Sequence, residues 1–214
     1  MDFKYIFLNY FLAFCISIFI IISAVFSVCM FKPLYYFDIN ALNLQSRMPI
    51  SIYEIKKNYN YAVDYILEKT DDNFSLPSLP SSENGKTHFY EVRMIFKSLK
   101  SLWIITFGVS ILYGIFKIIN KDYLFFKYSG NILITFSALI VLASLFNFNY
   151  IFTLFHKLFF NNDYWIFNSS LDPIILLLPE KFFYHCSVIV LCITSLSGII
   201  FKIIYQTFKK SNRK

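Results

Sequence analysis

The sequence predicts an all-α polytopic membrane protein, with four transmembrane helices and a small extracytoplasmic cap formed by two outer loops. Of the 214 residues, 57% are hydrophobic and only 15% are charged, whereas soluble domains carry roughly 45–50% and about 25%. The apolar residues are concentrated in four runs, and a helix of about 20 mostly apolar residues crosses a bilayer. We therefore expect residues 1–214 to form a single membrane domain.

Charged residues mark the ends of the four apolar runs. The first run begins after Lys4 and ends before Lys32-Pro33, and lysines flank the other three. Lysines at such positions extend their side chains to the membrane interface. The expected spans are residues 5–30, 99–119, 128–148 and 182–205.

The first long segment between spans covers residues 31–98. Pro49-Ile50-Ser51 can begin a helix, because an apolar stripe at helical spacing follows it. That stripe consists of Ile52, Ile55, Tyr59, Ala62, Val63 and Ile66. Residues 71–82 contain Asp71, Asp72 and a run of serines and prolines, which predicts a loop.

The second long segment covers residues 149–181. Its apolar run, residues 174–178, lies between Pro173 and Pro179 and is too short to cross a bilayer. We expect a re-entrant or interfacial segment there. Asp172 and Glu180 at its ends could be catalytic carboxylates, although for Asp172 an ordinary boundary charge is the favoured interpretation.

Basic residues predict the orientation of the chain. The net charge is +7, and lysines beside apolar spans favour anionic lipid headgroups as partners rather than nucleic acid. The positive-inside rule places both termini and residues 121–127 in the cytoplasm. That side then holds, against only Asp2 and Asp122, the following residues: Lys4, Lys117, Lys121, Lys127, Lys202, Lys209, Lys210, Arg213 and Lys214.

The four cysteines lie in apolar surroundings without CxxC spacing. Their positions, Cys15, Cys29, Cys186 and Cys192, favour buried small hydrophobic side chains over disulfides or zinc ligands.

His88, His156 and His185 are the only histidines, and this topology places all three on the outer side. Histidine suits proton transfer near neutral pH. On a helix, His88 and Glu91 would share a face, so that the carboxylate could orient the imidazole. On a strand they would point to opposite faces. A solvated start of an interfacial helix explains this motif about as well.

His156 lies in Leu154-Phe155-His156-Lys157-Leu158, which also fits an amphipathic interfacial segment. His185 is expected to be an interfacial histidine with a local partner. If His88 and His156 share one reacting centre, their side chains should approach within about 10 Å.

Several mechanisms lack their characteristic residues. The chain has no Gly-x-Ser-x-Gly elbow, no exposed cysteine nucleophile and no HExxH motif. Acid–base chemistry by histidine on a lipid-phase substrate remains, or no chemistry at all.

Two stretches resemble the bacterial lipoprotein intramolecular transacylases. The first, His88-Phe89-Tyr90-Glu91-Val92-Arg93, is similar to that family's His-Met-x-Asp-Val-Lys/Arg motif, with Glu91 where the family has Asp. The second is the more specific and contains, in order, His156, Phe159, Phe160, Asn162, Trp165, Phe167, Pro179, Glu180, Phe182 and Phe183. The motifs occur in the family's order, and the resemblance covers nearly the whole chain.

The resemblance implies an enzyme of the bacterial cell membrane, with its active site on the extracytoplasmic face. Its substrate would be a diacylglyceryl-modified lipoprotein with a free α-amine, and it would move the sn-2 acyl chain to that amine. The product would be a lyso-form lipoprotein. The ester-to-amide exchange is downhill, so we expect no cofactor or metal.

The resemblance also assigns the site. His88 is the expected general base, oriented by Glu91, and His156 would assist as oxyanion donor or as acid, although the reverse assignment stays open. The expected substrate-binding residues are Arg93, Phe159, Phe160, Trp165 and Glu180.

Two alternatives remain. One is a non-enzymatic membrane component, such as a transporter subunit or assembly factor, which would tolerate loss of either histidine. The other is a membrane acyltransferase that takes its acyl chain from phospholipid and makes a three-chain product.

Overall fold

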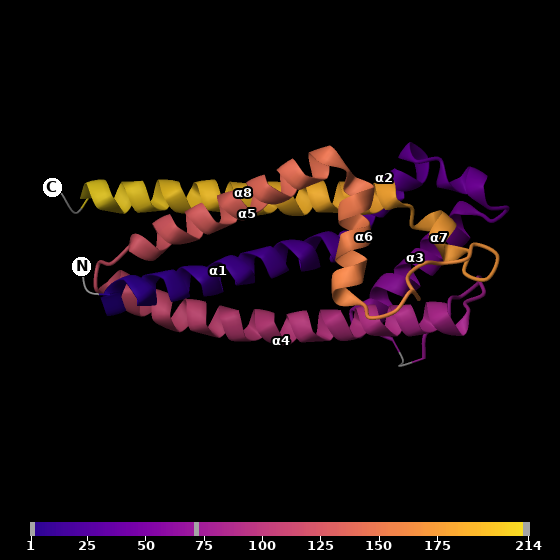
Figure 1. Cartoon of the computed structure of the whole chain (residues 1–214), viewed down its shortest axis with the longest axis horizontal. Coiled ribbons are helices and arrows are strands. Elements are labelled where there is room, and N and C mark those ends of the chain that lie inside the picture. Colours follow the sequence, from indigo (N-terminus) through magenta and orange to yellow (C-terminus); the bar gives the residue numbers. More distant parts are fainter. Residues whose placement is uncertain (1–2, 71–72, 212–214) are drawn as a thin grey trace. The chain divides into compact units, whose positions relative to one another are not determined.

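The computed structural model describes residues 3–70 and 73–211, and this part of the chain is helical with no strand (Figure 1). The charged residues Asp2, Asp71, Asp72, Arg213 and Lys214, which entered the sequence predictions, lie outside the described residues.

Four of the described helices are long and apolar enough to cross a membrane, as predicted. They are α1 (Phe3–Met30), α4 (Glu83–Ile119), α5 (Leu124–Phe146) and α8 (Glu180–Ser211). The largest difference is in α4, which begins at Glu83, well before its expected span. The polar stretch before its apolar part contains residues that favour helices, among them Lys86, Met94 and Lys97.

The chain forms two compact units. The first comprises Met1–Phe26, Lys100–Phe146 and Val188–Lys214, and the second comprises Ser27–Leu99 and Asn147–Ser187.

Close helix contacts hold the first unit together. The backbones of α5 and α8 approach so closely that a Cβ on Gly130 would lie 2.7 Å from the carbonyl oxygen of Gly198. Small residues permit such approaches between membrane helices. The indole of Trp103 in α4 donates a hydrogen bond to the Ser23 hydroxyl in α1, with an N–O distance of 2.8 Å.

The second unit is built around α3 (Ile52–Ile66). Ser51 and Glu54 form a capping box at its start, which satisfies backbone N–H groups that a helix end leaves unpaired. The predicted apolar stripe is confirmed, because these residues lie in or against the core of the unit: Ile52, Ile55, Tyr59, Ala62, Val63 and Ile66.

Four shorter helices complete the second unit. They are α2 (Lys32–Ala41), η1 (Leu44–Arg47), α6 (Phe148–Phe159) and α7 (Ile174–Leu177). The apolar run at α7 is too short to span, as predicted, and it packs inside the unit. Ile174 and Leu177 are fully buried in the core, and the Leu177 carbonyl accepts a hydrogen bond from the Tyr35 hydroxyl.

All four cysteines are free thiols. Cys15 is buried and Cys29 and Cys186 are half-buried, but Cys192 is exposed, so burial was wrongly predicted for that residue.

Candidate active site

Two imidazoles from distant parts of the chain meet in the second unit. His88 lies in the first turns of α4 and His156 in the last turn of α6, which ends beside α4 (Figure 1). Their ring centroids are 6.1 Å apart. The predicted approach of the two side chains within about 10 Å is therefore confirmed.

His88 is surrounded by aromatic rings and is only 7% exposed. The Phe160 ring centroid lies 4.7 Å from its imidazole, and the Phe167 ring meets it edge-on at 5.4 Å. Nδ1 of His88 is buried without a hydrogen-bond partner among the described residues. Because burial without an acidic partner disfavours a charged imidazolium, this site favours neutral His88.

His156 is held in one tautomer by its own helix. Its Nδ1 lies 2.7 Å from the Phe152 carbonyl oxygen, and a carbonyl only accepts, so Nδ1 carries the proton and Nε2 keeps a free lone pair. The indole of Trp165 stacks on the imidazole at 4.7 Å. Burial lowers the pKa of His156, although the hydrogen bond to Phe152 opposes this shift. At neutral pH this side chain is therefore an uncharged base.

Glu91 does not orient His88 in this structure, contrary to the sequence-based expectation. Its Oε1 accepts a hydrogen bond from the Asn162 amide at 2.7 Å, and its Oε2 is buried without a partner. The two residues share a helix face, but the Glu91 carboxylate extends to the segment that follows α6. There the Asn162 carbonyl also accepts a hydrogen bond from Trp165 Nε1, so Glu91 is linked through Asn162 to the ring that stacks on His156.

The predicted substrate-binding residues divide into two groups. Phe160 and Trp165 contact the histidines directly, and Phe159, next in the chain, is half exposed. Arg93 is buried, with its guanidinium 4.7 Å from the centre of the Tyr65 ring. Glu180 accepts a hydrogen bond from Asn149 at 2.6 Å. These contacts of Arg93 and Glu180 are with groups other than the two imidazoles.

His185 has a partner, as predicted, but it comes from a segment 147 residues away in the chain and not from nearby residues. Its Nδ1 lies 2.9 Å from both carboxylate oxygens of the fully buried Asp38. Within residues 3–70 and 73–211, no group of three or more His, Cys, Asp or Glu side chains could hold a metal ion.

The sequence does not indicate the role of Asn162, nor that of Ser82 and Gly85, which contact Asp172 at the start of α4. The glycine was the available signal, because glycine in the first turn of a helix indicates a close approach.

The profile of the lipoprotein intramolecular transacylase (Lit) family matches residues 10–183. The chain belongs to this family. The expected resemblance, and with it an acyltransferase of the lipoprotein intramolecular transacylase class, is confirmed.

Solved structures of the membrane-integral Lit from Bacillus cereus share this fold. One matches with a TM-score of 0.93 and 32% sequence identity, over 97% of this chain and 96% of that one. Two variants of the same protein, with a histidine replaced by arginine or by alanine, match with TM-scores of 0.86 and 32% identity. They cover 97% of this chain and 92% and 94% of theirs. Comparison with curated proteins gives no significant match.

The Glu91–Asn162 hydrogen bond predicts how loss of either residue affects the transacylase. Glu91→Ala and Asn162→Ala should lower the rate of acyl transfer by similar factors, and the double variant should be little worse than either, because contacting residues act as a unit. Mass spectrometry of lipoprotein N-termini measures the rate. A far larger loss in Glu91→Ala than in Asn162→Ala would instead indicate a direct action of Glu91 on His88.

Proposed function

We propose that this member of the Lit family moves the sn-2 acyl chain of a diacylglyceryl-cysteine to the α-amine of the same lipoprotein, which yields a lyso-form lipoprotein. Family membership supports the reaction class. The observation that carries the proposal is the meeting of two imidazoles, one of which keeps a free Nε2.

The tautomer of His156 supports a reversal of the roles expected from the sequence. The neutral amine attacks the ester carbonyl carbon, and His156 Nε2 then takes a proton from the new ammonium. Unpaired buried N–H groups are rare, so the proton of His88 is better placed on Nε2 than on the unpartnered Nδ1. His88 gives that proton to the leaving glycerol oxygen as the C–O bond breaks.

Protons balance within this step. One proton passes in net from the amine nitrogen to the glycerol oxygen, and a proton returned from His156 to His88 resets the pair. The acyl group never bonds to the protein, so the enzyme contributes position and proton transfer, which are large sources of rate in such reactions. The exchange of ester for amide is downhill and requires no ATP or metal.

A bacterial cell membrane location, with both termini in the cytoplasm and the histidines outside, is supported by the distribution of lysines. In a variant free of native cysteines, a cysteine at the exposed position Asn161 should react with an impermeant reagent in intact cells. If this cysteine reacts only after lysis, the orientation is the reverse of the proposed one. The histidines would then lie on the opposite side of the membrane from the proposed substrate.

The origin of the transferred chain tests the reaction. Expressed in a host lacking such an activity, the chain should block lipoprotein N-termini while each lipoprotein keeps two acyl chains. His88→Ala and His156→Ala should each lower the rate by at least about 100-fold, because each removes a proton-transfer group. Labelled phospholipid, added after diacylglyceryl transfer, should leave the amide unlabelled.

The third histidine provides the control. His185→Ala, combined with Asp38→Asn so that no unpaired carboxylate stays buried, should retain the activity. Label in the amide or a three-chain product would show a phospholipid-dependent acyltransferase. Full activity of both single histidine variants, at equal abundance, would be incompatible with the proposed site.

The pH dependence should show two protonations. The amine must be neutral to attack, so log kcat/KM should rise with a slope of about 1 up to the amine pKa near 8. Burial holds the pKa of His156 below its ordinary value of 6.5, so the slope should increase to about 2 only at lower pH, where His156 is protonated. Rates from pH 5 to 9 measure this, and persistence of the steeper slope in His156→Ala would exclude His156 as the base.

A further inference from the structure

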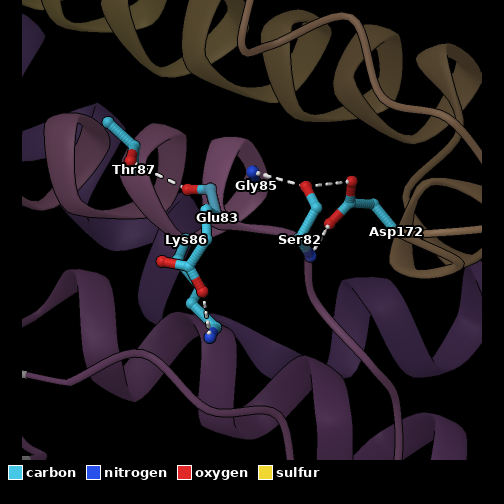
Figure 2. A network of polar contacts seen from close by, with 6 residues as sticks. All are labelled: Ser82, Glu83, Gly85, Lys86, Thr87 and Asp172. Atoms are coloured by element: carbon cyan, nitrogen blue, oxygen red, sulfur yellow. Dashed lines mark hydrogen bonds and ion pairs between the residues drawn. The ribbon is translucent and has the colours of Figure 1, made fainter.

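Asp172 ties the segment after α6 to the first turn of α4 (Figure 2). Its Oδ1 accepts the Ser82 backbone N–H at 2.8 Å, and its Oδ2 accepts the Ser82 hydroxyl at 2.7 Å. The Ser82 oxygen in turn accepts the Gly85 N–H at 3.0 Å. Asp172 is only 4% exposed, so this carboxylate is buried with both oxygens occupied.

Gly85 makes room for this tie. A Cβ at position 85 would run into the Asp172 carboxylate. Glycine weakens a helix relative to alanine, so its presence in the first turn of α4 has a structural reason, namely the close approach of Asp172.

Capping alone does not require Asp172. The Ser82 hydroxyl already accepts the Gly85 N–H, and both α3 and α6 are capped by their own residues, Ser51 and Asn147. What Asp172 adds is a charged hydrogen bond between segments 90 residues apart in the chain. Hydrogen bonds to an ionised group are stronger and shorter than neutral ones.

The hydrogen bonds of Asp172 position chain segments on both sides of His88. On one side they hold the start of α4, in which His88 lies. On the other, the Asp172 backbone N–H donates to the Asn168 carbonyl at 2.7 Å, which closes the turn after Phe167, whose ring packs edge-on against His88. The Glu91–Asn162 hydrogen bond joins the same two segments beyond His88.

We propose that Asp172 is a positioning residue for the transacylase reaction: through Ser82 and Gly85 it sets His88 in register with His156. The expected effect on kcat rests on the proposed function. The expected effect on the burial of His88 does not depend on which reaction the protein catalyses.

The test uses the full-length protein in detergent, with a synthetic diacylglyceryl-cysteine lipopeptide as substrate. Asp172→Ala and the similar-sized Asp172→Asn should lower kcat by about 10- to 100-fold, because small displacements of a catalytic group have effects of this size. KM should change little, because Asp172 is buried with both oxygens bonded to Ser82 and is not placed to contact substrate. Asp64→Asn is the matched control, because Asp64 forms a partly buried ion pair with Lys32 in the same unit.

A swap tests the tie itself. Ser82→Asp alone brings two carboxylates together and should be impaired. Ser82→Asp with Asp172→Ser restores a carboxylate–hydroxyl pair, and should recover more of kcat than either single change.

Reaction with diethyl pyrocarbonate gives a readout without substrate. With three histidines in the chain, mass spectrometry assigns each modified site. His88 should be protected in the wild type and in Asp64→Asn, and should react several-fold faster in the Asp172 variants. Unchanged kcat in folded Asp172→Asn, a lower kcat with His88 still protected, or failure of the swap to recover activity would each overturn the proposal. An inactive wild type would refute the proposed function instead, and the modification experiment would still test the position of His88.

Discussion

Two carboxylates hold residues 160–172 against the first turns of α4, and the candidate site depends on this contact. His88 comes from α4 and His156 from α6, so neither helix alone contains a site. Asp172 joins the segment to α4 before His88, and Glu91 joins it through Asn162 after His88. The same segment supplies Phe160 and Phe167 to the His88 ring.

The same contact sets the electrostatics of the site. Aromatic rings bury His88 and partly cover His156, which lowers the local dielectric constant and disfavours imidazolium. A neutral pair suits a reaction in which a neutral amine attacks an ester, because each imidazole can then accept or donate one proton without first losing a charge. The hydrogen bond from His156 Nδ1 to the Phe152 carbonyl determines which ring nitrogen can accept a proton, because it leaves Nε2 as the accepting atom.

Much of this arrangement could be predicted from the sequence. The apolar runs predict the four long helices because length and hydropathy decide membrane insertion, and Pro49-Ile50-Ser51 before an apolar stripe predicts the start of α3. The two histidine motifs predict which imidazoles meet. The start of α4 could not be predicted in the same way, since charged residues interrupt its apolar pattern before residue 99 and helix propensity alone is a weak guide to where a helix begins.

The partners of the acidic residues were harder to predict. The residues around Asp172 do not reveal whether it is a boundary charge or a buried hydrogen-bond acceptor, because its partner Ser82 lies 90 residues away. Helical spacing placed Glu91 beside His88, but spacing does not reveal a competing acceptor or donor from another segment. For Asp172, the glycine at position 85 indicated a close approach. For Glu91, no nearby residue indicated that Asn162 would be its partner.

Glu91 also shows how the site accommodates a departure from the family motif, in which an aspartate is expected. Its carboxylate lies 2.7 Å from the Asn162 amide, so the longer side chain is used to reach a neighbouring segment and not the imidazole. In an intramolecular transfer, nucleophile and ester arrive together, and rate depends mainly on how well they are oriented. The Glu91 carboxylate binds Asn162, whose carbonyl also accepts from the Trp165 indole, so Glu91 is placed to hold the ring that stacks on His156.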